Sequence, residues 1–152
     1  MKLKNSDLEA IVSSQSYRKL FTTEFDDILL VLEIRRQNED LQPALKAYIE
    51  TKKALLERHC DKDPATKEPI RGPAGNYSFT QDPSSMQTFQ TKFNELLDVE
   101  IEIDASKVKI AASALNSVSR WSGSDISIIY PFVEIYEDDK SNDKKGKLTK
   151  IK

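Results

Sequence analysis

The chain has 152 residues, of which 38% are hydrophobic and 8% aromatic, and its formal net charge is −2. This length fits one domain that buries about two-thirds of its unfolded surface. A single cysteine, Cys60, excludes an internal disulfide, and 23 basic against 25 acidic side chains give no general attraction to nucleic acid or anionic lipid. No long apolar run follows Met1, so we expect no signal peptide, no membrane span and a cytosolic location.

The opening residues predict two short helices. Asn5 or Ser6 can cap the first helix, because a side-chain oxygen at this position accepts an unpaired backbone N–H. The serine-rich run 13–16 weakens that helix, and apolar spacing restarts at Tyr17.

The longest helical signal is the segment Thr22–His59, which holds no glycine and one proline. Thr22 or Thr23 is its expected cap. Two apolar stripes at helical spacing are separated by a polar stretch, and Pro43 disfavours helical geometry at the residue before it. We therefore expect either a kinked helix or a helical hairpin, with the break within Asn38–Pro43.

An irregular loop is expected over Asp61–Asp82, where proline and glycine are frequent and Asn76–Phe79 is the one strand-like stretch. Asp82 or Ser84 then starts an amphipathic helix. Its apolar face comprises Met86, Phe89, Phe93, Leu96 and Leu97.

After that helix the hydrophobic period changes from helical to alternating. Val99–Ile103 and Lys107–Ile110 both alternate apolar and charged residues, which predicts two half-buried strands. In one hairpin register Glu102 faces Lys107 on the charged side, while the apolar side is also matched. We expect this antiparallel hairpin, joined at residues 104–106.

The last third of the chain is less regular. Ala111–Trp121 is ambiguous between helix and loop, Ser122–Asp125 is a turn or a helix cap, and Ile126–Ile135 is an apolar element interrupted by Pro131. The sequence predicts an α+β fold in one domain over residues 1–136, with helices packed on a small antiparallel sheet. From its composition we expect residues 137–152 to be a charged, lysine-rich tail that is flexible unless bound.

Candidate chemical groups are sparse. His59, Cys60, Asp61 and Asp63 offer metal-ligand atoms but lack a second Cys/His pair at zinc-site spacing. Neighbouring residues on a helix point about 100° apart, which argues against a Cys60–His59 catalytic dyad. We therefore predict no catalytic, cofactor or metal site and a protein that is not an enzyme.

Three stretches carry a resemblance to a known family. They are Leu3-x-Asn5-x-x-Leu8, the end of the long helical segment at Ala54-Leu55-Leu56-Glu57-Arg58-His59, and Phe93-Asn94-Glu95-Leu96-Leu97-Asp98-Val99-Glu100-Ile101-Glu102-Ile103. With the short apolar ending at Ile126–Ile135, the chain resembles a family of small tailed-bacteriophage proteins of unknown function. The resemblance implies a phage context and transfers no catalytic residues.

In that context we expect an accessory protein that acts by protein–protein binding in virion structure or assembly, located in the host cytoplasm or the virion. One alternative is an early phage protein that binds and inhibits a host defence factor. Another is nucleic-acid contact through the lysine-rich tail. A second copy of the chain is a further candidate partner, and no membrane contact is expected. The candidate partner-binding residues are Leu30, Val31, Ile34, Arg35, Arg36, Lys140, Lys144, Lys145 and Lys147.

Overall fold

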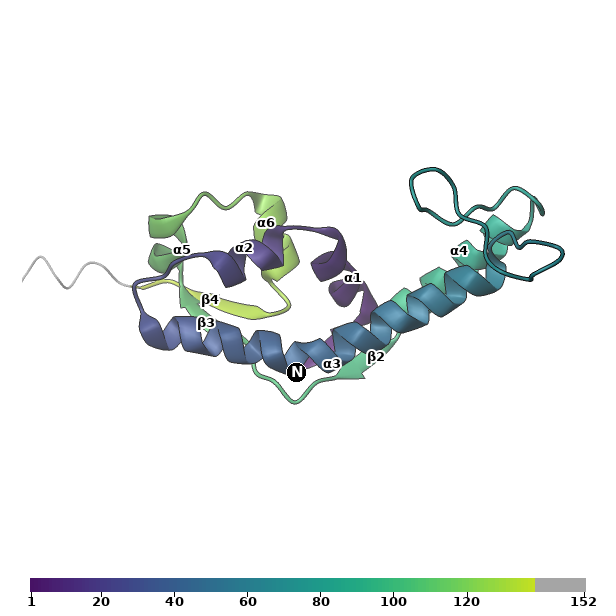
Figure 1. Cartoon of the computed structure of the whole chain (residues 1–152). Helices are drawn as coiled ribbons and strands as arrows, with labels where there is room; N and C mark the ends of the chain where they lie inside the picture. Colours follow the sequence, from purple (N-terminus) through teal and green to yellow (C-terminus); the bar gives the residue numbers. More distant parts are fainter. Residues whose placement is uncertain (139–152) are drawn as a thin grey trace, which may run out of the picture.

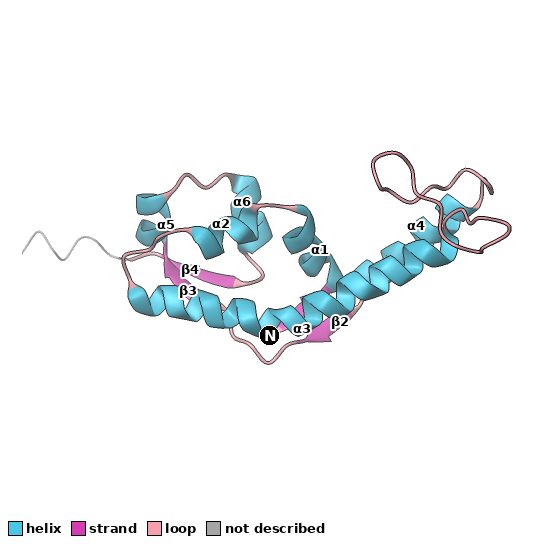
Figure 2. Cartoon of the chain, viewed as in Figure 1, coloured by secondary structure: helices cyan, strands magenta, loops and turns pink. Residues whose placement is uncertain are grey.

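The computed structural model describes residues 1–138, and the tail lysines named above lie outside these residues. The fold is α+β, as the sequence predicts (Figure 2). Six helices and four strands are found in the described part of the chain. Their order is β1 (Lys2–Lys4), α1 (Asn5–Ser13), α2 (Ser16–Thr22), α3 (Ile28–His59), α4 (Ser85–Asp98), β2 (Glu100–Glu102), β3 (Val108–Ala111), α5 (Ala112–Val118), α6 (Gly123–Ile129) and β4 (Val133–Tyr136).

The long helix α3 runs the length of the molecule (Figure 1). Its 32 residues span about 48 Å at the usual rise per residue. Pro43 lies inside the helix, whose axis changes direction near its middle, so the hairpin alternative is wrong and the kinked helix is the correct one. The helix starts at Ile28 rather than near Thr22, because the Asp27 side chain accepts hydrogen bonds from the first-turn amides.

The predicted hairpin of β2 with β3 is also wrong. β2 instead pairs antiparallel with β1, so that Leu3 lies opposite Ile101. β3 pairs in parallel with β4, with Val108 opposite Val133. The two observed pairings, β1 with β2 and β3 with β4, bury apolar residues against other parts of the chain. A hydrogen bond from the Ile103 amide to the Met1 carbonyl oxygen (2.9 Å) extends the β1–β2 pair. Residues 104–107 therefore connect two separate sheets.

The core lies where α1, α2 and β3 pack against α3, with α6 packed on α1 and α2 and with β4 paired to β3. Tyr17 packs edge-on against Phe132, with ring centroids 5.2 Å apart. The largest side chains that are fully buried are Leu8, Leu20, Leu41, Ile110, Ile129, Phe132 and Val133. These residues come from six different elements or their connections, so the first half of α3 and the sheet share one core.

The second half of α3 and α4 form an arm that projects from this body (Figure 1). Phe89 and Phe93 on α4 stack with ring centroids 5.5 Å apart. The residues between α3 and α4 form the predicted loop at the far end, where Asn76–Phe79 contributes one isolated bridge, at Tyr77, rather than a strand. Among the described residues no helix is both long and apolar enough to cross a membrane.

The predicted cap of the first helix is wrong, because α1 begins at Asn5 and its N-cap is Lys4. The Lys4 amide donates to the Asp7 carboxylate (2.8 Å). The Asn5 side chain donates to the Leu96 carbonyl oxygen instead (3.0 Å).

Other local predictions agree with the structure. α1 and α2 flank the serine-rich run, and α4 begins after Asp82 accepts a hydrogen bond from the Ser84 amide (2.9 Å). Ser122 caps α6, with its hydroxyl accepting from the Asp125 amide (3.0 Å). Pro131 separates α6 from β4, and the ambiguous segment after β3 contains the short helix α5.

Candidate functional site

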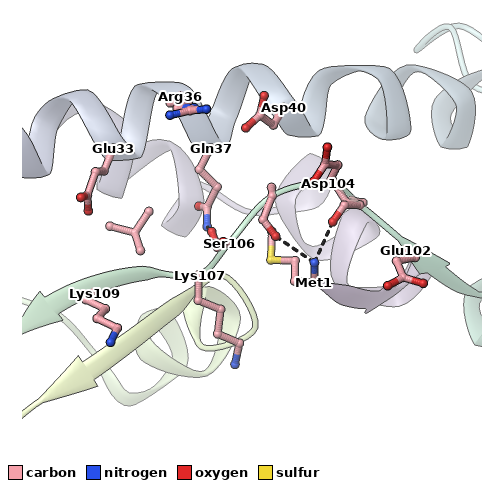
Figure 3. Close-up of a pocket in the computed structure, with 13 residues that line it drawn as sticks. Met1, Glu33, Arg36, Gln37, Asp40, Glu102, Asp104, Ser106, Lys107 and Lys109 are labelled. Carbon is pink, nitrogen blue, oxygen red and sulfur yellow. Dashed lines mark hydrogen bonds between the residues drawn. The ribbon is translucent and has the colours of Figure 1, made fainter.

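A groove of about 910 Å³ lies between the first half of α3 and the chain that runs from β2 into β3 (Figure 3). Its α3 wall presents Glu33, Arg36 and Asp40, which share one side of the helix because residues three and four apart are neighbours. Gln37 lies among them but points inward and is 3% exposed. The groove therefore has a charged rim and a buried amide at its base.

The opposite wall comes from β2, the connection and the first residues of β3. Lys109 projects from β3 and Lys107 lies just before the strand, and both are exposed while the intervening Val108 is buried. The Lys107 ammonium lies 5.2 Å from the centroid of the Tyr130 ring and 3.5 Å from the Tyr130 carbonyl oxygen. Glu102 and Asp104 add two carboxylates to this wall.

The connection between the two sheets is held in place by main-chain contacts. The Met1 amine donates to the carbonyl oxygens of Ile103 (2.7 Å) and Ala105 (2.8 Å), as the dashed lines in Figure 3 show. The Gln37 amide nitrogen donates to the carbonyl oxygen of Ser106 (3.0 Å). These bonds fix the wall on both sides of Asp104.

Charged side chains of both signs meet in the groove without neutralising one another. Among residues 1–138, no ion pair involves any charged side chain of the groove. The acidic members are Glu33, Asp40, Glu102 and Asp104, and the basic members are Arg36, Lys107 and Lys109. None of these charged side chains is therefore held in an ion pair within the described residues.

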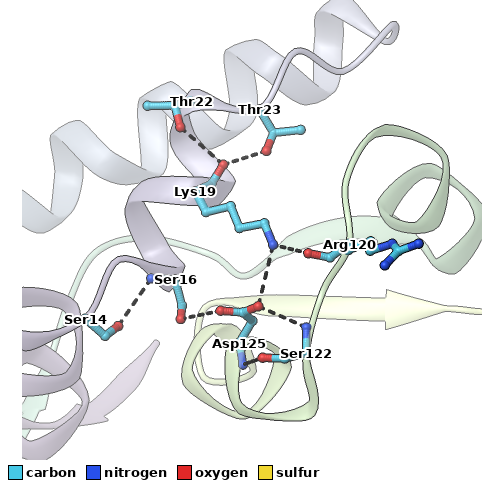
Figure 4. A network of polar contacts seen from close by, with 8 residues as sticks. All are labelled: Ser14, Ser16, Lys19, Thr22, Thr23, Arg120, Ser122 and Asp125. Carbon is cyan, nitrogen blue, oxygen red and sulfur yellow. Dashed lines mark hydrogen bonds and ion pairs between the residues drawn. The ribbon is translucent and has the colours of Figure 1, made fainter.

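A second polar cluster joins α2 to α6, on another part of the body (Figure 4). The Asp125 carboxylate accepts from the Ser16 hydroxyl (2.8 Å) and the Ser122 amide (2.9 Å) and lies 3.5 Å from the Lys19 ammonium. The Ser122 amide, followed by the serine hydroxyls, lowers the pKa of Asp125 to about 2. Lys19 also donates to the Arg120 carbonyl oxygen. Because its polar groups bind one another, this cluster is a structural contact between two helices.

Asp61, one of the candidate metal ligands near the end of α3, binds groups of the following loop. The Asp61 carboxylate accepts from the Ser78 hydroxyl (2.6 Å) and from the amides of Thr80 (2.6 Å) and Gln81 (2.8 Å). Burial alone would raise the pKa of Asp61, but these bonds lower it below its ordinary value. Burial raises the pKa of the Cys60 thiol. Within the described residues no three metal-binding side chains are grouped around a common point.

Two of the predicted partner-binding residues are wrongly assigned to the surface. Leu30 and Ile34 are 7% and 2% exposed and belong to the core, because they share the face of α3 that lies against the body. Val31 is half-buried, whereas Arg35 and Arg36 are exposed. Of the five residues, Arg36 alone lines the groove.

The carboxylates of β2 lie opposite lysines in a strand pair, but these lysines belong to β1 and are not the predicted Lys107 and Lys109. Glu100 and Glu102 lie opposite Lys4 and Lys2 of β1. Charge balance across a sheet is thus present, but β1 supplies the lysines. Lys107 remains free of this pairing.

The groove residues Glu33, Gln37 and Asp40 were not among the sequence candidates. Their signal was the polar stretch in the middle of the long helical segment, which we interpreted as a break between two apolar stripes. A glutamine buried in the middle of that stretch follows the helical spacing of Leu30, Ile34 and Leu41. That spacing indicates a helix that continues through the polar stretch.

Comparison of the chain with protein-family models, curated proteins and solved structures gives no match.

Proposed function

We propose that this protein is a non-enzymatic bacteriophage accessory protein, acting in virion structure or assembly by binding a polypeptide segment of another phage protein in the α3 groove. The observation that carries the proposal is the set of groove charges of both signs that have no ion pair among the described residues. The phage context comes from the sequence resemblance.

The chemistry of the groove favours a polypeptide over a small metabolite. Pockets for small molecules are mainly apolar, with a few polar groups that orient the ligand. In this groove, seven of the thirteen lining residues carry charged side chains, and apolar residues such as Val108 line the rest together with polar groups. A protein segment offers side chains of both signs together with backbone donors and acceptors, and so can satisfy such walls.

The spacing of the charges suits an extended segment. Lys107 immediately precedes β3 and Lys109 lies within it, two residues further on, which is a spacing of about 7 Å along extended backbone and matches alternate side chains of an extended peptide. Glu33 and Asp40 are two helical turns apart, about 10 Å along α3. We expect the bound segment to place acidic residues beside the lysines and basic residues beside the helix.

The proposal is tested by affinity purification of the full-length tagged protein from phage-infected cells, with partners identified by mass spectrometry. Lys107→Glu combined with Lys109→Glu should reduce recovery of a virion component at least about tenfold, since like charges then face the acidic segment. The matched control reverses two exposed cations outside the groove, Arg18→Glu and Lys46→Glu, and should recover the wild-type amount.

Three results would contradict the proposal. Equal loss in the groove and control variants would mean that binding depends on overall charge. Recovery of no virion component by the wild-type protein would remove the assembly role. A host protein recovered in a groove-dependent manner would replace that role with host-factor inhibition.

A further inference from the structure

The first turns of α3 expose an apolar surface that the body does not cover. Ile28 and Leu29 are each 67% exposed and Leu32 is 54% exposed, while Leu30 and Ile34 on the opposite face are buried. We call the three exposed residues the α3 stripe. Ile28 and Leu32 are four residues apart and so lie on one side of the helix.

Opposite charges border the two ends of the α3 stripe. Glu24 and Asp26, the acidic end, are exposed and precede the helix. Arg35 and Arg36, the basic end, are exposed and follow Leu32 by about one turn. Within residues 1–138 none of these four side chains takes part in an ion pair.

We propose that the α3 stripe is a self-association surface that binds the α3 stripe of a second copy in antiparallel orientation. A two-fold axis near Leu30 would place Ile28 of each copy against Leu32 of the other. The same operation brings the acidic end of each copy to the basic end of the other. One symmetric contact thus covers the apolar residues and pairs both sets of charges.

The order of groups along the surface is what selects a second copy as the occupant. An acidic, apolar, basic sequence along a line is complementary to itself when one copy is reversed, and a symmetric dimer requires this self-complementarity. The surface is small, so we expect a concentration-dependent dimer with a dissociation constant on the order of micromolar.

Sedimentation equilibrium of the full chain at several concentrations tests the proposal. Wild type should show a monomer–dimer equilibrium, and Leu32→Glu should weaken it at least about tenfold. Ile49→Glu is the matched control, because Ile49 is on the same helix, is 47% exposed and lies outside the α3 stripe. Far-UV circular dichroism of each variant shows whether the helices are retained.

Charge reversal makes the test specific to the antiparallel arrangement. The variant Arg35→Glu with Arg36→Glu has two acidic ends. The variant Glu24→Lys with Asp26→Lys has two basic ends. Each variant alone should associate at least about tenfold more weakly than wild type, whereas their mixture should form a heterodimer with both ends paired.

Four outcomes would overturn the proposal. They are a wild-type protein that is monomeric at all concentrations, equal weakening by Leu32→Glu and Ile49→Glu, unchanged association in either charge variant alone, and no heterodimer in the mixture. The groove variant Lys107→Glu with Lys109→Glu should dimerise like wild type. Failure of the self-association surface is therefore distinguishable from failure of the groove, although Arg36 borders both.

Discussion

Gln37 lies between the core and the groove. Its replacement by leucine should lower the free energy of unfolding by more than is usual for a residue in an exposed polar stretch of a helix. The side chain is 3% exposed. Its amide nitrogen donates to the carbonyl oxygens of Phe132 (2.6 Å) and Ser106 (3.0 Å), and its amide oxygen accepts from the Tyr17 hydroxyl (3.3 Å). Gln37→Leu retains much of the volume and removes all three bonds.

The expected loss follows from which partners are left without a bond. The Phe132 carbonyl oxygen still accepts from the Val108 amide (3.1 Å), so its loss is partial. The Tyr17 hydroxyl and the Ser106 carbonyl oxygen lose the bond to Gln37, and an unsatisfied buried polar group costs about 1–3 kcal/mol. Because the contact to Ser106 is partly exposed, we expect the free energy of unfolding to fall by about 2–4 kcal/mol.

Urea denaturation of the purified chain measures this loss as a lower midpoint with an unchanged slope. A double-mutant cycle with Tyr17→Phe provides the control, because that change removes the hydroxyl which Gln37→Leu leaves without a partner. Tyr17→Phe should cost about 1 kcal/mol less in the Gln37→Leu background than in wild type. A loss below about 0.5 kcal/mol for Gln37→Leu, or strict additivity in the cycle, would refute the reasoning.

Two further predictions concern carboxylates that accept backbone hydrogen bonds. The pKa of Asp125 is lowered from 3.8 to about 2, chiefly by the Ser122 amide. The carboxylate therefore stabilises the fold fully above about pH 4, and this stabilisation disappears as the pH falls toward 2. Asp125→Asn should reduce the loss of stability in this acid range, and an unchanged acid dependence would contradict the assignment. Asp61→Ala should accelerate hydrogen exchange at the amides of Thr80 and Gln81 while the core amides stay protected. Unchanged exchange at both loop amides would mean that Asp61 does not order the loop.

Local signals were sufficient to predict the first four helices, whereas α5 was left ambiguous and the start of α6 was given only as a turn or a cap. α4 has an apolar face at helical spacing after an aspartate that can accept a hydrogen bond, and α6 has a serine cap with an aspartate three residues later. The start of α3 was misplaced because several residues before it can cap a helix. Only the three-dimensional path of the chain selects Asp27 among them.

Strand pairing could not be predicted in the same way, because it depends on distant segments. The hairpin satisfied both of its faces in a single register, yet Lys2-Leu3-Lys4 matches Glu100-Ile101-Glu102 equally well, with lysine opposite glutamate and leucine opposite isoleucine. β4 likewise offers β3 a buried apolar partner. β1 and β4 both carry patterns that match their partner strands, but they are far from those partners in sequence, so the pattern alone does not show that they are close in space.

The failure of the hairpin also explains why Lys107 and Glu102 do not lie opposite each other at the groove. Had β2 paired with β3, Lys107 would have faced Glu102, and the two charges would have balanced each other. Because β2 pairs with β1, whose lysines lie opposite its carboxylates, Lys107 has no carboxylate opposite it in a strand pair, whereas Lys109 lies opposite Glu134 of β4. The connection through Asp104 places Lys107 beside α3. The strand topology that completes the core is thus the same feature that separates Lys107 from Glu102 and leaves both side chains exposed at the groove.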